Sequence, residues 1–378
     1  MSMRLEARTS VSRVALVGAP FGAIIVTLAI CALLVAWAGA PVGRAYLLLL
    51  EGGFGSRFAW SETLTRATPL MLTGLAVAVA FRTRLFNIGA EGQLYLGALA
   101  AVAVGGQVDG GMPAWVATLP ADAQVPVLFG AMVAAGMLAG AVLLLGPTLL
   151  KLRLGVDEVV TTLLLNFIVL LLVSMMLDGP MKDPLAMGWP QSVALVSELE
   201  LTRLMERSRV HSGLLAAMAL AVAIWAVNRF TVFGLQMRAV GANARAAAFA
   251  GMPVARVTVL AALLSGALAG LAGVVEVAGR TGYLTLDISP GYGYAGVVIA
   301  MLAGLHPLGV VAASIFVAGV LVGADGMSRA AGVPNAIADV IVAVALIAML
   351  VATMLTRYRI RLDGAARAAR AGQAGRAG

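Results

Sequence analysis

Long stretches of uncharged, apolar residues run through this chain, and they restrict its fold more than any other feature. One stretch spans residues 15–37, and similar stretches recur along the sequence. A bilayer core about 30 Å thick needs roughly 20 helical residues per crossing, and lipid excludes unpaired backbone polar groups. The stretches do not show the alternating pattern of a transmembrane barrel. They therefore predict an all-α integral membrane protein with several crossings.

Charged residues make up only 12% of the 378 residues, about half their share in soluble domains. Polar punctuation between the apolar stretches predicts about ten spans. We place them near residues 15–37, 63–80, 86–105, 126–150, 158–177, 212–228, 257–278, 291–304, 308–324 and 335–355. The first is expected to be an uncleaved span. Pro307 separates the eighth and ninth, which are either two short crossings or one broken, re-entrant element.

Basic residues predict the orientation, because Lys and Arg accumulate in cytoplasmic loops. With the N-terminus inside, most of the 26 Lys and Arg residues fall in inner segments, and both termini are cytoplasmic. The expected regions are a basic N-terminus (1–14), a transmembrane domain (15–356) with an inner loop (229–256), and a basic, disordered tail (357–378). The net charge of +8 then reflects topology and contact with membrane lipids, and it gives no argument for nucleic-acid binding.

An odd number of spans in each half predicts an inverted repeat of five plus five spans. LTGLAVAVA (72–80) resembles LSGALAGLAG (264–273), and each precedes a glycine-punctuated polar stretch. Inverted repeats usually place the solute route at their interface, near the middle of the membrane.

The stretch FNIGAEGQ (86–93) carries three polar side chains at the mouth of a predicted span. On a helix, Asn87, Glu91 and Tyr95 share one face, and Gln93 points away from it. Because a carboxylate facing lipid is costly, Glu91 needs a partner or a cavity.

Two interpretations of Glu91 remain open. It caps the helix at the inner surface, paired with Arg82 or Arg84, or it lines a solute route.

Three further polar residues lie in predicted spans. Asn166 is expected to make an interhelical hydrogen bond or to contact a polar solute. Tyr292 and Tyr294 belong to GYGYAG, which is not a dinucleotide motif because no strand precedes it. They either anchor the outer interface or stack on a ring-shaped solute.

The inner loop between spans six and seven contains arginines and no acidic residue. Gly241 and Gly251 bracket an alanine-rich segment that predicts two or three helical turns. This helix either lies on the lipid surface or docks on a cytosolic partner. Elsewhere, Cys31 and the two histidines stand apart, so we expect no metal site.

FNIGAEGQLYLGAL, DEVVTTLLLNF, GANARAAAFAGM and GLHPLG, in this order, resemble the permease subunits of ATP-driven importers of the ribose and branched-chain amino acid type. The similarity covers about residues 15–358 and is greatest to the nucleoside or simple-sugar branch. One departure is His306, where many relatives have Asn.

The resemblance implies import of a nucleoside, a simple sugar or a related small polar solute across the bacterial inner membrane by alternating access. It implies a cytosolic ABC ATPase that binds ATP and magnesium, a second permease chain (identical or a sister), and an extracytoplasmic substrate-binding protein. This chain contains no GxxxxGK[ST] phosphate loop and is not expected to be an enzyme.

By the same resemblance, two groups of residues form the candidate sites. The substrate pathway comprises Asn87, Glu91, Gln93, Tyr95, Asn166, Tyr292 and Tyr294. The ATPase-coupling segment comprises Arg238, Gly241, Asn243, Arg245, Ala247 and Gly251.

Two other classes of protein also fit parts of the pattern. An ion-coupled secondary transporter would have inverted repeats and broken helices as well. An intramembrane enzyme is disfavoured, because no Ser, His and Asp set forms an identifiable site.

Overall fold

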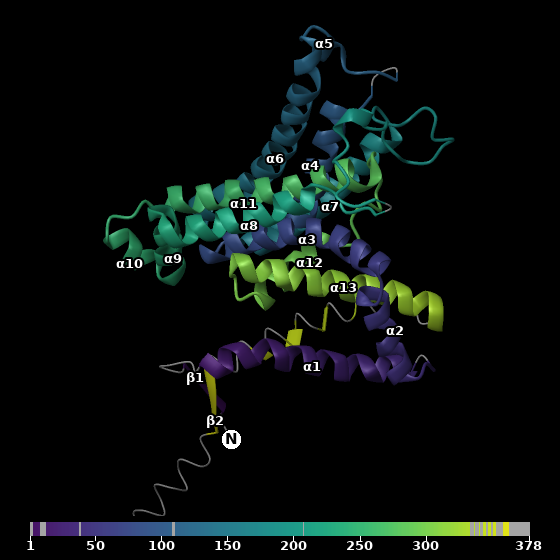
Figure 1. Ribbon diagram of the computed structural model, residues 1–378. Coiled ribbons are helices and arrows are strands. Elements are labelled where there is room, and N and C mark those ends of the chain that lie inside the picture. Colours follow the sequence, from purple (N-terminus) through teal and green to yellow (C-terminus); the bar gives the residue numbers. More distant parts are fainter. Residues whose placement is uncertain are drawn as a thin grey trace, which may run out of the picture. The chain divides into compact units, whose positions relative to one another are not determined.

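A computed structural model describes residues 3–7, 13–37, 39–107, 110–206, 208–332 and 358–362, with separate positions between 336 and 352 (Figure 1). The chain divides into two units, Met1–Val42 with Asp339–Gly378, and Gly43–Ala338.

The first unit contains α1 (Arg13–Trp37) and a two-stranded antiparallel sheet. Strand β1 (Met3–Ala7) pairs with β2 (Tyr358–Leu362), so that Met3 lies opposite Leu362. Strand β2 belongs to the tail predicted to be disordered, and the rest of that tail lies outside the described residues. Most of the predicted span 335–355 also lies outside them, and that span stays a prediction.

The second unit is almost entirely helical. Its elements are α2 (Val42–Phe54), α3 (Arg57–Arg82), α4 (Ala90–Gly105), α5 (Ala114–Ala117), α6 (Ala121–Leu154), α7 (Glu158–Asp178), η1 (Ser197–Leu199), α8 (Gly213–Phe230), α9 (Val232–Ala242), α10 (Ala244–Phe249), α11 (Val254–Glu276), η2 (Val277–Thr281), α12 (Tyr292–Leu302) and α13 (Pro307–Ala331). Element η2 is a π-helical turn that extends α11.

Within the described residues, 6 helices are long and apolar enough to cross a membrane, or up to 7 if Gly22–Trp37 and Val42–Phe54 form one broken span. The chain is therefore a multi-pass membrane protein, but these residues do not confirm ten spans. Two predicted spans are too short: α4 has 16 residues and α12 has 11. By contrast, α13 is long enough to cross by itself, so the predicted eighth and ninth spans are separate helices.

The long helices interlock around the two short ones. Helix α11 packs along α4 and α6, whereas α3 packs along α12 and α13 (Figure 1). Glycines permit the closest approaches. A Cβ atom on Gly270 would lie 3.1 Å from the carbonyl carbon of Gly136 in α6, and one on Gly97 would lie 2.6 Å from the Cα of Gly270. The glycine face of α11, which carries Gly266, Gly270 and Gly273, is thus a packing surface.

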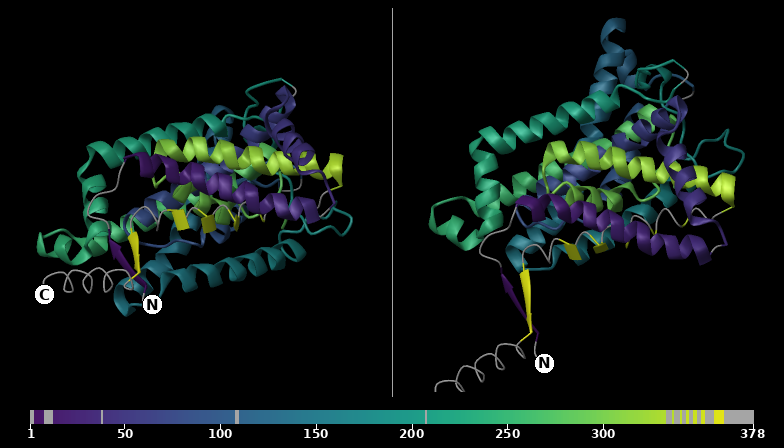
Figure 2. Two further views of the ribbon diagram at one scale, coloured as in Figure 1. Left: turned by 90° about the horizontal axis from the view of Figure 1, so that it is seen from below. Right: turned by 60° about the horizontal axis from the view of Figure 1, so that its bottom comes forward.

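The basic loops gather at one end of this unit. Arg82 donates to the carbonyl of Leu305 at 2.8 Å, and Lys151 donates to the carbonyl of Arg84 at 2.7 Å. Helices α9 and α10 project at the same end (Figure 2), where Gly241 packs against the carbonyl of Arg82.

The opposite end is covered by the segment between α7 and α8. Its backbone hydrogen-bonds both to the end of α4, through Val196 and Gly105 (3.0 Å), and to η2, through Leu201 and Ala278 (2.9 Å). The C-terminal ends of α4 and α11 therefore lie at the same end, away from the basic loops.

Candidate functional site

Asn87 and Gln93 form a buried amide pair. The Asn87 amide donates to Gln93 Oε1 at 3.0 Å, and Gln93 donates back to Asn87 Oδ1 at 2.9 Å. Asn87 also donates to Ser265 Oγ at 3.1 Å, and Ser265 donates to the carbonyl of Ala76 at 2.7 Å. This network joins α3, α11 and the loop before α4. The predicted helical stripe is wrong for Asn87, because α4 begins only at Ala90.

Glu91 links the N-termini of the two short helices. Its Oε2 accepts a hydrogen bond of 2.6 Å from the backbone N–H of Gly293 in α12. A Cβ atom on Gly293 would lie 2.6 Å from the carbonyl carbon of Ala90, so the two helix ends touch. A carboxylate here satisfies otherwise unpaired N–H groups and suits the positive end of the helix dipole.

The predicted pairing of Glu91 with Arg82 or Arg84 is therefore wrong. Glu91 does cap a helix, but the helix is α12, which is distant in sequence, rather than its own α4. Its side chain is 3% exposed and faces protein.

Asn166 of α7 supports the same junction. Its Oδ1 accepts from the N–H of Gly92 at 2.8 Å, and its amide donates to the carbonyl of Ile88 at 3.0 Å and to the Tyr294 hydroxyl at 3.2 Å. The expected interhelical hydrogen bond is confirmed. The tyrosine contact also brings α7 to α12.

The tyrosines differ in exposure. Tyr95 is buried and donates to the carbonyl of Leu286. Tyr292 is 1% exposed and receives a weak contact of 3.5 Å from Arg280, so the expectation of an interfacial anchor is wrong for this residue. Tyr294 is 37% exposed and is the member of the seven predicted pathway residues that reaches the surface. The structure thus gathers all seven around the α4 and α12 junction.

Two hydroxyl groups at this junction were missed by sequence reasoning. Thr73 of α3 donates to the carbonyl of Tyr292 at 3.0 Å, where α12 begins. Ser265 of α11 holds Asn87, where the chain turns into α4. Each hydroxyl lies directly before a glycine, in LTG and in LSG, so the matched sequence segments were the available signal.

Charged side chains lie beyond the junction, towards the end opposite α9 and α10. Glu276 and Arg280, one helical turn apart, form an ion pair with 2.5 Å between Oε1 and Nη1. Arg66 of α3 pairs with Asp325 of α13 at 2.6 Å. Within the part of the chain that the structure describes, no group of three His, Cys, Asp or Glu residues could hold a metal ion.

The predicted coupling segment forms two helices separated by Asn243. The Asn243 side chain accepts from the backbone N–H groups of Arg245 and Ala246, and so caps α10. Gly251 ends this turn with a φ of +79°, which favours glycine. Arg238 donates to the carbonyl of Asn228. These contacts are structural.

The remaining side chains of this segment differ in exposure. Arg245 projects into solvent, whereas Ala247 is buried against neighbouring elements. Phe249, which was not among the predicted coupling residues, is 97% exposed at the end of α10. A fully exposed aromatic ring beside an arginine is typical of a contact surface for another protein.

The sequence of this chain is similar to those of known transport proteins. The family model described as branched-chain amino acid transport system / permease component matches residues 59–350. The guanosine ABC transporter permease protein NupP of Bacillus subtilis is 36% identical over 327 residues, which is 86% of this chain and 90% of that protein. No solved structure matches significantly.

Two further relatives differ in the solute that their names give. The glucose ABC transporter permease protein TsgB13 of Haloferax volcanii is 34% identical over 95% of this chain and 94% of its own length. The nucleoside ABC transporter permease protein NupB of Lactococcus lactis is 30% identical over 78% of this chain and 80% of its own length. The chain therefore belongs to the permease component family of branched-chain amino acid transport systems, whose members are membrane components of ABC transporters rather than enzymes.

Proposed function

We propose that this chain is the permease subunit of an ATP-driven importer in the bacterial inner membrane, and that it translocates nucleosides. The similarity to NupP over nearly the whole chain carries the proposal, and the nucleoside permease NupB adds to it. The glucose permease keeps a simple sugar as the second candidate solute. An ion-coupled secondary transporter is not favoured, because the relatives are named as ABC permeases.

The junction of α4 and α12 supports the proposed route. Short helices whose N-termini meet inside the protein are typical of transporter solute sites, where inverted repeats join. Thr73 lies nine residues from the end of α3, or about 13 Å at the helical rise, so α12 begins well inside the bundle. Helix α3 of the first half of the chain packs on α12 of the second half, and α11 of the second half packs on α4 of the first half. Such reciprocal packing between the two halves is typical of an inverted repeat.

The seven predicted pathway residues keep a role in this proposal. Six of them hold the junction together through buried hydrogen bonds, and Tyr294 reaches the surface. Movement of α4 against α12 during alternating access would break and re-form the bonds of Glu91 and Asn166.

Partners follow from the same family assignment. The chain would pair with a second permease chain, identical or a sister, and receive solute from an extracytoplasmic binding protein. A cytosolic ABC ATPase would bind ATP and magnesium. Helix α10 is the proposed docking element, since Arg245 and Phe249 project from the basic end, which would face the cytoplasm under the positive-inside rule.

ATP turnover by the assembled importer tests this coupling. Arg245→Glu and Phe249→Ala should each lower the ATPase rate that guanosine and the binding protein stimulate, at least tenfold for a centrally packed contact. Arg153→Glu is a matched control, because Arg153 is an exposed arginine at the same end, on α6. Unchanged turnover in both α10 variants, with the complex intact, would remove the docking role. Arg238→Glu is less informative, because Arg238 also holds the Asn228 carbonyl.

A further inference from the structure

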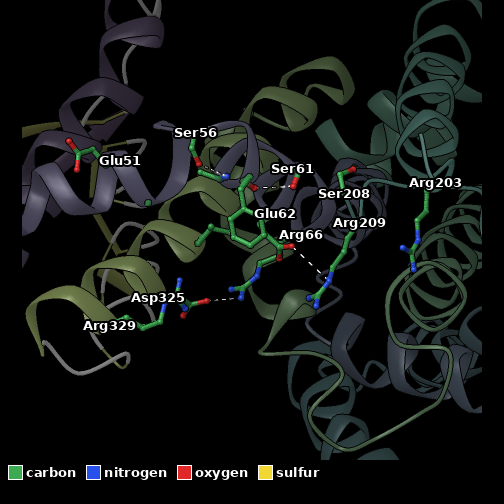
Figure 3. Close-up of a pocket in the computed structure, with 14 residues that line it drawn as sticks. Glu51, Ser56, Ser61, Glu62, Arg66, Arg203, Ser208, Arg209, Asp325 and Arg329 are labelled. Carbon is green, nitrogen blue, oxygen red and sulfur yellow. Dashed lines mark hydrogen bonds and ion pairs between the residues drawn. The ribbon is translucent and has the colours of Figure 1, made fainter. Parts of the chain in front are cut away.

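A cavity of about 820 Å³ lies at the end opposite α10, between α2, α3, α13 and the segment before α8. Figure 3 shows charged side chains from these separate elements around the cavity, with Glu62, Arg66, Arg209 and Asp325 near its centre. None of the seven predicted pathway residues lines it. Its volume falls in the usual range for a small-molecule site and exceeds that of one nucleoside.

The charges of this cavity are only partly paired. Arg66 and Asp325 make a close ion pair, and Glu62 lies 4.0 Å from Arg209. Three further charged residues of the lining have no ion-pair partner among the described residues: Glu51, Arg203 and Arg329. Both an acidic and two basic side chains of the lining therefore remain available to a solute.

One unsatisfied polar atom belongs to this wall. Arg66 Nε, a donor, is buried without a hydrogen-bond partner. Buried polar atoms without partners are rare in folded proteins, and a solute hydroxyl can both donate and accept.

The chemistry of the lining selects a class of ligand. Three carboxylates disfavour an anion, and four arginines disfavour a cation. A neutral ring with several hydroxyl groups satisfies both kinds of charged group. Phe58, which is 69% exposed and lines the cavity, offers an apolar face for a ring to stack on.

We propose that this cavity binds the solute through its polyhydroxylated ring, the ribose of a nucleoside, before the solute reaches the junction of α4 and α12. The inference rests on the proposed function and adds a solute site. A ribose and a glucose ring share this chemistry.

Photolabelling of the full-length chain in lipid nanodiscs tests the location. With 8-azidoguanosine as the probe, label that excess guanosine displaces should appear on peptides covering residues 51–66 or 203–209. Glu51→Gln and Arg203→Gln should each reduce displaceable label about tenfold, the loss expected for one hydrogen bond to a charged group. Neither substitution breaks an ion pair, because Glu51 and Arg203 have no ion-pair partner among the described residues. Glu206→Gln is the control, because Glu206 is exposed on the same segment outside the lining.

Other results would overturn the proposal. Displaceable label confined to residues 86–95 or 292–294 would place the solute at the junction only. The absence of displaceable label, in a chain whose assembled importer takes up guanosine, would refute the cavity site and leave the proposed function standing. An assembled importer that takes up neither guanosine nor glucose would refute the proposed function itself.

Discussion

Replacing Glu91 by leucine should destabilise the chain strongly, whereas glutamine should be tolerated. Glu91 Oε2 accepts from the Gly293 N–H at 2.6 Å, and the side chain is buried. Leucine fills a similar volume but accepts no hydrogen bond. The buried Gly293 donor left without a partner costs about 1–3 kcal/mol, and the lost interaction of the charge with the helix dipole adds about 1–2 kcal/mol, so the change should cost roughly 2–5 kcal/mol.

Glutamine keeps one side-chain oxygen that can still accept from Gly293. Its cost should stay within about 1–2 kcal/mol, from the weaker neutral bond and the altered dipole interaction. Thermal unfolding of the purified chain in detergent, followed by tryptophan fluorescence, ranks the melting temperatures of the two variants and the unmodified chain. Glu198→Leu serves as a control at an exposed position. Equal melting temperatures for Glu91→Leu and the unmodified chain would refute the capping of α12.

Two further predictions concern other contacts. Gly241→Val should lower stability by about 1–3 kcal/mol in the same melting assay, because a side chain there meets the Arg82 carbonyl, whereas Gly130→Ala, with open space around it, should be neutral. Burial lowers the pKa of His211 to about 4, so the unfolded chain, with a pKa near 6.5, binds this proton more readily. The stability due to neutral His211 is present above about pH 6.5 and should fall by up to about 3 kcal/mol as the pH drops to 4. A His211→Gln variant that melts with the same pH dependence would contradict this account.

Local patterns predicted local contacts well. Glu276 and Arg280 are one helical turn apart, a spacing that favours an ion pair, and the pair forms. The apolar stretches located the long helices, with ends that differ by up to seven residues (α13 ends at Ala331 rather than 324), because hydrophobic length is a property of the segment itself. The α10 segment also formed between its two glycines, although it is shorter than predicted.

Contacts between distant segments could not be predicted in this way. The stripe drawn through Asn87 assumed a continuous helix, but Asn87 pairs with Gln93 and Ser265, which keeps the chain out of the helix before Ala90. Glu91 accepts its hydrogen bond from Gly293, some 200 residues later in the sequence. The cavity was missed for the same reason, because Arg66 and Asp325 meet only once α3 packs on α13.

Uptake by proteoliposomes that hold the assembled importer distinguishes ATP-driven import from ion-coupled transport. With the binding protein and guanosine outside and ATP with magnesium inside, guanosine should accumulate. Accumulation should cease when a non-hydrolysable ATP analogue replaces ATP, and proteoliposomes containing this chain alone should show none. Accumulation by the chain alone, driven by a sodium or proton gradient without ATP, would contradict the account.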